Sequence, residues 1–320
     1  MKTQSEAIDL TEQKKKAQKK ARKRNGDPFS GWKENMSGYL FIAPMFLGTS
    51  LLVLFPIFAS LALSFTDWNF VSGYNNVNFI GFDNFTALFS NGLFLKALKN
   101  NFVLLLAIPV TLMVSLALAV IINRYVYLKD LFKVIYFMPF ISSIVAVAVV
   151  FQVMFHPTQG PINQLLMSIG IDHPPEWIAD VAYSLPSVML IMIWTSIGFN
   201  LIIYLAGLQN IPKELYEAAQ IDGASAWFQF TKITIPLVSP TTFLLLVTGV
   251  ISSFKVFDLI IVLTEGGPAN STLTPVVYLY QQAFIELKTG YASAIALVMF
   301  IIILIITYLQ FIGQKKWVNY

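Results

Sequence analysis

The chain has 320 residues, of which 56% are hydrophobic and only 12% are charged, and its formal net charge is +4. Soluble domains carry about 25% charged residues, so this composition argues against a soluble globular protein. Cysteine is absent, which excludes disulfides, thiolate metal sites and a cysteine nucleophile. The two histidines, His156 and His173, share one proline-containing segment and offer little from which to build a metal site.

A basic segment, residues 1–38, precedes the first apolar run. Eight of the eleven residues from Lys14 to Arg24 are lysine or arginine, and so dense a run of like charge cannot bury itself. We expect a disordered cytoplasmic tail held at anionic lipid, where each basic residue near the surface contributes about 1 kcal/mol. This interpretation is plainer than a nucleic-acid-binding arm, so we expect no nucleic-acid partner.

Six apolar runs follow, each long enough to cross about 30 Å of hydrocarbon as a helix. Five of them contain no charged residue, and the fifth run in chain order carries Lys255 and Asp258 near its far end. They predict an all-α, polytopic membrane protein with six transmembrane helices within residues 39–313, followed by a short cytoplasmic tail, 314–320. The runs are Tyr39–Phe65, Phe102–Ile122, Val134–Phe155, Val181–Leu208, Leu237–Leu263 and Tyr291–Gly313.

The distribution of lysine and arginine between the loops predicts the orientation, because cytoplasmic loops are enriched in both. With the N-terminus inside, seventeen of the 21 basic residues are cytoplasmic and three are outside, and Lys255 is left within a span. We therefore expect a multi-pass protein of the bacterial plasma (inner) membrane, embedded in the lipid bilayer, with both termini in the cytoplasm.

The segment between the fourth and fifth runs, residues 210–236, is a polar loop on the cytoplasmic side. It contains Glu217-Ala218-Ala219, then Asp222 and Gly223, and nine residues later Ile233-Thr234-Ile235-Pro236. The alanines favour a helix whose backbone another protein can approach closely, and Gly223 allows the chain to reverse before a second short helix. The proline suits the first turn of the fifth span. An ordinary interfacial helix–turn–helix remains an alternative for this pattern taken alone.

This pattern resembles the Glu-Ala-Ala loop of ABC-importer permeases, which ends in Ile-x-Leu-Pro; here Ile235 stands where leucine is usual. The resemblance implies the type I ABC importer permease fold. It also implies that a cytoplasmic ATPase subunit grips this loop, with Glu217 facing a basic group. The implied complex contains a second permease subunit, two ATPase subunits and an extracytoplasmic solute-binding protein.

The chain contains no nucleotide-binding sequence of the form Gly-x-x-x-x-Gly-Lys-Ser/Thr. We therefore expect ATP and Mg to be bound by the partner ATPase, and no cofactor in this chain. A Ser-His-Asp, paired-carboxylate or metal constellation is also absent from the sequence. The prediction is a transport subunit with no catalytic residue, and not an enzyme.

Motifs in the outer loops narrow the resemblance to the carbohydrate branch, the maltose-type permeases. Gly81-Phe82-Asp83-Asn84-Phe85 matches a Phe-x-Gly-x-x-Asn-Phe stretch, and Gly290-Tyr291-Ala292-Ser293-Ala294 matches Gly-Tyr-Ala-Ser-Ala. Thr264-Glu265-Gly266-Gly267-Pro268 is similar to Thr-Gly-Gly-Gly-Pro, with Glu265 in place of one glycine. The resemblance covers residues 38–313. It implies import of a carbohydrate, in particular an oligosaccharide.

Polar side chains inside the fourth and fifth spans are the candidates for a substrate pathway, because such groups are costly in a membrane and usually face a cavity or another helix. Permeases that this chain resembles bind sugar between these helices, through aromatic rings and hydroxyl or amide groups. Helix–helix packing through small residues explains the same pattern, and both interpretations stay open for each residue. The candidates are Trp194, Ser196, Phe199, Asn200, Gly249, Ser252, Ser253, Lys255 and Asp258.

Lys255 and Asp258 are three positions apart, so they can pair on one helix face. The alternative is that Lys255 lines the outer part of the pathway and favours an anionic solute, such as a sugar phosphate or a glycerol-phosphate-like anion. A gradient-driven secondary transporter is a more distant alternative, because such proteins often show inverted repeats with broken helices and charged coupling residues.

Overall fold

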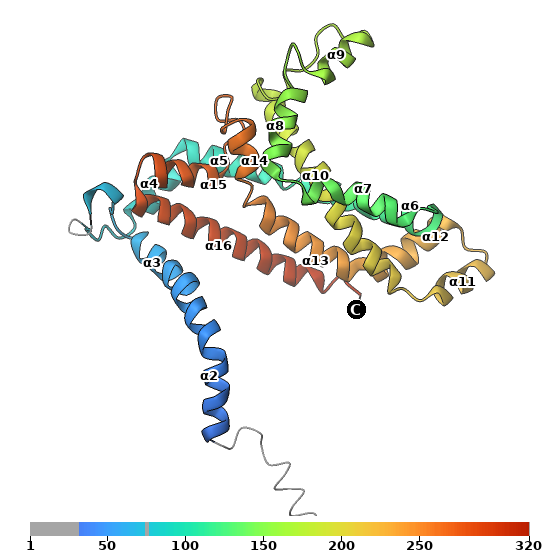
Figure 1. Cartoon of the computed structure of the whole chain (residues 1–320), viewed down its shortest axis with the longest axis horizontal. Coiled ribbons are helices and arrows are strands. Elements are labelled where there is room, and N and C mark those ends of the chain that lie inside the picture. Colours follow the sequence, from blue (N-terminus) through green and yellow to red (C-terminus); the bar gives the residue numbers. More distant parts are fainter. Residues whose placement is uncertain (1–31, 74–76, 320) are drawn as a thin grey trace, which may run out of the picture. The chain divides into compact units, whose positions relative to one another are not determined.

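The computed structural model describes residues 32–73 and 77–319 (Figure 1). These residues are almost entirely helical, and the only β-type pairing among them is an isolated bridge between Thr66 and Phe79. The chain divides into two compact units, Met1–Ala59 and Ser60–Tyr320. The all-α prediction is confirmed for the described residues, and most of the predicted basic tail lies outside them.

The first span is one long apolar helix, made of α2 (Trp32–Thr49), the π-helical turn η1 (Ser50–Leu54) and α3 (Phe55–Leu63). Its stretch from Gly38 to Leu63 is long and apolar enough to cross a membrane. Helix α2 begins at Trp32, so residues 32–38 of the predicted tail are helical, and the membrane-spanning stretch begins next to the predicted Tyr39. The π-helical turn ends two residues before Pro56, which lacks the N–H that an α-helical bond would need there.

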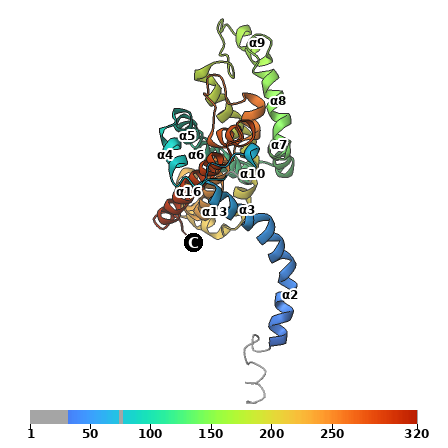
Figure 2. The same ribbon diagram turned by 90° about the vertical axis from the view of Figure 1, so that its left-hand side faces the viewer.

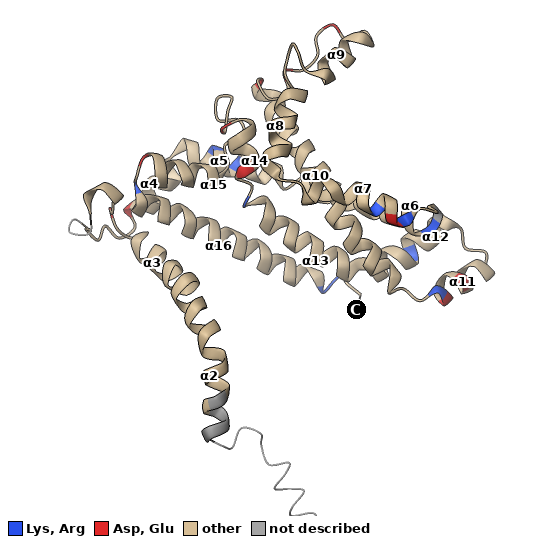
Figure 3. Cartoon of the chain, in the orientation of Figure 1, with Lys and Arg blue, Asp and Glu red and all other residues tan. Residues whose placement is uncertain are grey.

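Beyond the first span the chain is a bundle with short helices at both ends (Figure 1). Helices α4 and α15 lie at one end of the long helices, and α11 and α12 lie at the other. In Figure 3 the charged residues lie in the short helices, the loops and the helix ends, whereas the long helices α10, α13 and α16 contain none. In chain order the elements are η2 (Phe70–Ser72), α4 (Asp83–Ser90), α5 (Gly92–Leu104), α6 (Ala107–Tyr125), α7 (Lys129–Ile141), α8 (Ile144–Met154), α9 (Pro161–Ser168), α10 (Val181–Gln209), α11 (Lys213–Ile221), α12 (Ala226–Gln229), η4 (Phe230–Thr234), α13 (Ile235–Ser253), α14 (Asp258–Leu263), α15 (Pro275–Tyr280), η5 (Gln281–Ile285) and α16 (Thr289–Gln314).

Among the described residues, five continuous helices can cross a membrane, and a sixth span is a bent pair. The bent pair is α7 with α8, which meet at 91° where a straight third span was expected. The chain is extended at Ser142, whose hydroxyl donates to the carbonyl of Met138 at 2.8 Å, and Pro139 removes a helical donor nearby. Paired serines and proline are established causes of such bends.

The fifth span also differs from the prediction of Leu237–Leu263. Its helix begins at Ala226 and ends at Ser253, and the chain then breaks before α14. Pro236 lies in the first turn of α13, as predicted, although the helix continues upstream of it through η4 and α12. The π-helical turn η4 stands just before this proline, as η1 does before Pro56, and a wider turn relieves the missing N–H.

Helix α10 is the centre of the bundle and packs most extensively on α6 and α7. Two hydrophobic clusters form the core, one between the first half of α10 and α5, α8, α14, α15 and α16, the other between the second half of α10 and α6 and α13. Helix α8 carries α9 away from the bundle (Figures 1 and 2). The two clusters fix the helices on either side of the region where the polar residues of α10 and α13 meet.

Candidate functional site: a central cavity and a docking loop

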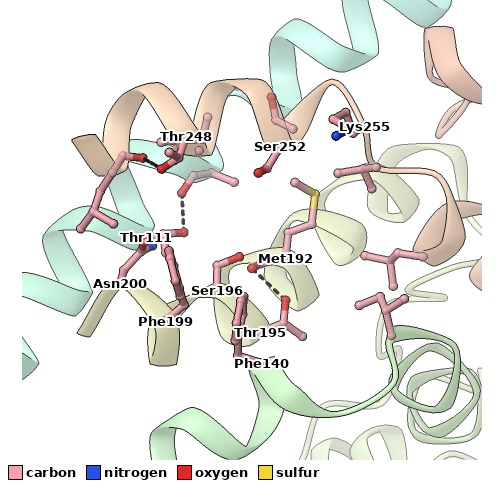
Figure 4. A pocket seen from close by; sticks show the side chains of 18 of the residues that line it. Thr111, Phe140, Met192, Thr195, Ser196, Phe199, Asn200, Thr248, Ser252 and Lys255 are labelled. Atoms are coloured by element: carbon pink, nitrogen blue, oxygen red, sulfur yellow. Dashed lines mark hydrogen bonds between the residues drawn. The ribbon is translucent and has the colours of Figure 1, made fainter. Parts of the chain in front are cut away.

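A cavity of about 460 Å³ lies where α6, α10 and α13 meet the bend between α7 and α8 (Figure 4). Residues 255–259, which connect α13 to α14, line part of it. Ligand sites usually have volumes of about 300–1,000 Å³, so this cavity can hold a small molecule or part of a longer one. The two breaks in helix geometry, in the third and fifth spans, both border the cavity.

Close packing of α10 against α7 forms one wall. A side chain at Gly198 would collide with the carbonyl oxygen of Tyr136, so glycine is needed where the two helices touch. The ring of Phe199 stacks on that of Phe140, with centroids 4.9 Å apart and planes 24° from parallel. Both phenylalanines line the cavity, which gives it a flat apolar surface.

The polar side chains in the cavity fall into two groups. Four hydroxyls donate to carbonyls of their own helices and are therefore already satisfied: Thr111, Thr195, Thr248 and Ser253. Within the described residues, the side chains of five others have no hydrogen-bond or ion-pair partner. These are Ser196, Asn200, Ser252, Lys255 and Asp258, all of which line the cavity. The second group can bind a hydroxyl-rich ligand without breaking a bond of the protein.

Eight of the nine pathway candidates from the sequence line this one cavity. Trp194 does not: its side chain is 44% exposed, and its ring stands edge-on to Phe151 with centroids 5.5 Å apart. Gly249 lies against Ile108 of α6, so a larger residue there would press on the cavity wall.

The predicted pairing of Lys255 with Asp258 is wrong. Helix α13 ends at Ser253, so these residues lie on a turn and at the start of the next helix, and not on one helix face. The described residues contain two salt bridges, Lys133–Asp130 and Lys288–Glu286, and neither involves this pair. The cavity therefore contains one ammonium and one carboxylate that are not joined to each other.

Sequence reasoning missed the contributions of the second and third spans. Thr111 comes from α6, and Phe140 and Ile144 come from either side of the bend. Only Pro139 and the pair Ser142-Ser143 signalled that the third span breaks. No group of three or more His, Asp or Glu residues within the described chain could hold a metal ion.

The loop after α10 folds as the sequence predicts, with two short helices and a glycine turn. Helix α11 ends in a Schellman motif: the N–H of Ala224 donates to Ala219 O at 2.8 Å, and that of Gly223 donates to Gln220 O at 3.0 Å. Gly223 has φ +75°, the left-handed region that favours glycine. The side chain of Ser225 then caps α12 by accepting the N–H of Phe228 at 3.2 Å.

The outer surface of this loop combines charge with exposed apolar side chains. Glu217 and Asp222 are exposed, as is Ala218, whereas Ala219 is half-buried. Ile221 is 87% exposed and Trp227 is 71% exposed. Large apolar side chains beside carboxylates at a bundle end form a surface suited to another protein.

Tyr216, a residue that the sequence analysis did not single out, ties this loop to two membrane helices. Its hydroxyl lies 3.0 Å from Thr234 Oγ1, in the π-helical turn at the start of the fifth span. The Arg124 guanidinium, in the last turn of α6, stands 4.6 Å from the centre of its ring. We call these three residues the Tyr216 junction. Tyr216 directly precedes Glu217 in the sequence.

A helical bundle with a central polar cavity and an exposed helical loop at one end defines a membrane transport permease. The chain belongs to the family of binding-protein-dependent transport system inner membrane components, which it matches over residues 111–318. It is therefore an integral membrane subunit of an ABC transporter, a transport component and not an enzyme.

Relatives and solved structures support this assignment. The lactose transport system permease protein LacF of Rhizobium radiobacter is 33% identical over 291 residues, which cover 88% of this chain and 95% of LacF. A bacterial ABC transporter involved in the import of the acidic polysaccharide alginate has a similar chain, with a TM-score of 0.79 and 26% identity over 90% of this chain and 98% of that one. Its complex with an alginate pentasaccharide-bound periplasmic protein gives a TM-score of 0.78 at 26% identity, over 89% and 96% of the two chains.

Proposed function

We propose that this chain is one of two permease subunits of an ATP-driven importer for a carbohydrate, in particular an oligosaccharide. The observation that carries the proposal is the set of unpartnered hydroxyl and amide side chains beside the stacked Phe140 and Phe199 rings. Sugars present hydroxyls at their edges and apolar C–H faces, so a binding site needs both kinds of group. The similarity of this chain to a lactose permease and to an alginate transporter supports the same substrate class.

The proposed complex contains a second, similar permease, two ATPase subunits that bind ATP and Mg, and an extracytoplasmic solute-binding protein. The family name and the alginate transporter complex with its periplasmic protein support this arrangement. The excess of basic residues on one side supports a bacterial plasma-membrane location with both termini cytoplasmic. In this orientation α11 and α12 face the cytoplasm and the α4–α15 end faces outward.

The loop 210–236 is then the surface on which the ATPase docks. Glu217, Ala218, Ala219, Asp222 and Gly223 would form the contact, because alanines admit a close neighbour and Glu217 is exposed to meet a basic group. Removing one member of a desolvated ion pair costs about 3–5 kcal/mol, enough to separate the subunits. ATP-driven closure of the ATPases would move this loop and open the central cavity outward, and hydrolysis would return it.

Co-purification tests the subunit assignment. The tagged chain is isolated from its native membrane in mild detergent, as wild type, Glu217→Lys and the matched control Glu214→Lys, which changes an exposed carboxylate one turn away on the same helix. We expect an ATPase and a second permease with wild type and control, and loss of the ATPase with Glu217→Lys. Absence of any ATPase from all three samples would contradict the proposal.

Transport by the reconstituted complex tests the cavity. Asn200→Leu removes an unpartnered amide and should raise KM for sugar uptake about fivefold, the effect of losing a neutral hydrogen bond of about 1 kcal/mol. Thr248→Val is the matched control, because its hydroxyl already donates to the carbonyl of Leu244 and is not available to a ligand. Equal effects of both changes would show that the cavity does not contact the sugar.

An anionic sugar, such as a sugar phosphate or an acidic saccharide, is a second candidate substrate. Lys255 favours it, because its ammonium lines the cavity without a counter-ion within salt-bridge distance in the described part of the chain. The neighbouring carboxylate of Asp258 opposes it. Lys255→Met should lower uptake of an anionic sugar much more than uptake of a neutral one if this alternative is correct.

A further inference from the structure

A second cavity, of about 500 Å³, lies at the opposite end of the bundle from the docking loop. It is formed between the first outer loop, the start of α5 and the segment from α15 to α16. None of its lining residues belongs to the central cavity. We call it the outer cavity.

Backbone hydrogen bonds join two walls of the outer cavity, the first outer loop and the segment that leads into α16. The N–H of Gly290 donates to Trp68 O at 2.8 Å, and the N–H of Phe70 donates to Leu287 O at 3.2 Å. A side chain at Gly290 would collide with the carbonyl oxygen of Thr66, so only glycine permits this approach. The cavity is thus fixed by main-chain contacts and does not depend on flexible side chains.

Aromatic rings and amides supply most of the lining. Trp68, Tyr278 and Tyr291 contribute rings, and the last two stand edge to face with centroids 6.5 Å apart. Asn91 donates its side-chain N–H to the Tyr278 hydroxyl at 3.1 Å. Burial, and then a hydrogen bond to Tyr291, raise the pKa of Tyr278, so this phenol stays neutral.

Every charge that lines the outer cavity already has a partner. Asp67 accepts two hydrogen bonds from Asn78, at 2.8 and 2.9 Å. Lys288 Nζ lies 2.6 Å from Glu286 Oε2, and Gln282 donates to the other oxygen of the same carboxylate at 2.9 Å. Among the described residues Asp67 has no counter-ion, and the one cation in the lining, Lys288, is paired, so an anionic ligand is disfavoured and an uncharged one is accommodated.

Two amides keep free hydrogen-bonding groups. The Gln281 side chain has no partner within the described residues, and Asn69 uses only its oxygen, which accepts the N–H of Val71 at 2.9 Å. These groups can donate to and accept from hydroxyls of a ligand. Aromatic walls and free amides together match the surface of a neutral sugar unit.

We propose that the outer cavity is a second sugar site, which binds a neutral saccharide unit of the transported solute before it enters the central cavity. This inference rests on the proposed function for the identity of the solute and the side of the membrane. The hydroxyl-rich head group of a glycolipid shares the same chemistry, and the experiment separates the two sources.

The test uses the whole complex, labelled with 5-fluorotryptophan, in nanodiscs of phosphatidylcholine and phosphatidylglycerol, followed by ¹⁹F NMR. Trp68→Phe assigns the resonance of the outer cavity, and Trp177→Phe assigns a control in the second outer loop, where Trp177 stacks on Phe155. The probes are lactose and maltotriose as neutral sugars and an alginate trisaccharide as an acidic one.

We expect the neutral sugars to shift the Trp68 resonance saturably and leave that of Trp177 unchanged. Gln281→Leu should weaken this binding about fivefold by removing a neutral hydrogen bond. Asn200→Leu, in the central cavity, should impair transport while the Trp68 shift persists. No shift with neutral sugars, or tighter binding of the acidic trisaccharide, would overturn the proposal.

Three further outcomes are distinguishable. A shift that occurs only when a digalactosyl lipid is added to the nanodiscs would overturn the transported sugar as the ligand. If sugar is transported but Trp68 never responds, the second site fails while the proposed function stands. If the complex neither transports sugar nor binds it in either cavity, the proposed function fails as well.

Discussion

The Tyr216 junction is expected to carry motion from the docking loop to the central cavity. Tyr216 contacts α6 through Arg124 and the fifth span through Thr234, and both of these helices line the cavity. The variant Tyr216→Leu removes both contacts, whereas Tyr216→Phe removes only the hydroxyl and keeps the ring beneath Arg124. We expect each change to uncouple ATP hydrolysis from transport to a different extent.

The magnitudes follow from the two contacts. A neutral hydrogen bond contributes about 1 kcal/mol, and a cation–π contact at an exposed guanidinium contributes about 0.5–1 kcal/mol. Tyr216→Phe should therefore lower the number of sugars moved per ATP by up to about fivefold, and Tyr216→Leu by up to about tenfold to thirtyfold. The matched control is Tyr127→Leu, because Tyr127 is 98% exposed near the same end of α6.

The assay compares sugar uptake with phosphate release in proteoliposomes that contain the whole complex. A double-mutant cycle with Arg124→Gln should show that the effects of Arg124→Gln and Tyr216→Leu are less than additive, because both remove the same contact. Unchanged stoichiometry in Tyr216→Leu, or strictly additive effects in the cycle, would refute the role of the junction and leave it as a local packing contact.

Three further predictions concern stability. Gly198→Ala should cost about 1–3 kcal/mol by forcing α7 and α10 apart, seen as a lower melting temperature in detergent, whereas Gly313→Ala, where a side chain meets open space, should not destabilise the protein. Gly223→Ala should cost about 1 kcal/mol, because φ +75° disfavours a Cβ although there is room for it, and the loss should disappear with D-alanine introduced by semisynthesis. Lys288 lowers the pKa of Glu286 below its ordinary 4.5. The stabilising contribution of this carboxylate is therefore present above pH 4.5 and is lost as the pH falls through the folded-state pKa. NMR titration should show the pKa of Glu286 rising in Lys288→Met.

The sequence was sufficient for the existence of the spans and for the helix–turn–helix of residues 210–236, because both depend on local patterns. Apolar length located the helices, and the spacing around Gly223 predicted a turn that the Schellman motif confirms. The bend at Ser142-Ser143 was missed because the apolar run continues through it without a charge. Glu265 has φ +54°, in the left-handed region that favours glycine. The glycine that the resemblance gives for this position would therefore fit the same backbone without strain.

The composition of the cavity could be predicted only in part, because it depends on which helices become neighbours. Residues of α10 and α13 were identified since these helices flank the docking loop. Thr111 and Phe140 belong to spans that carry no comparable motif, and their place in the cavity follows from packing on α10. Periodicity identifies the buried face of a helix, but it does not identify the helix that this face contacts.

The central cavity and the Tyr216 junction lie along the same helices, so coupling between these two places needs no further chain of contacts. In α6, thirteen residues separate Thr111 in the cavity from Arg124 in the junction, a distance of about 20 Å along the axis. A tilt of about 3° at one end of a rigid helix of that length moves the other end by about 1 Å. Shifts of this size would change the spacing of cavity walls that pack closely, as at Gly249, where an added Cβ would lie 3.1 Å from the Ile108 side chain. A small displacement of α11 on docking would therefore reach the cavity through the Tyr216 junction as a change in helix tilt.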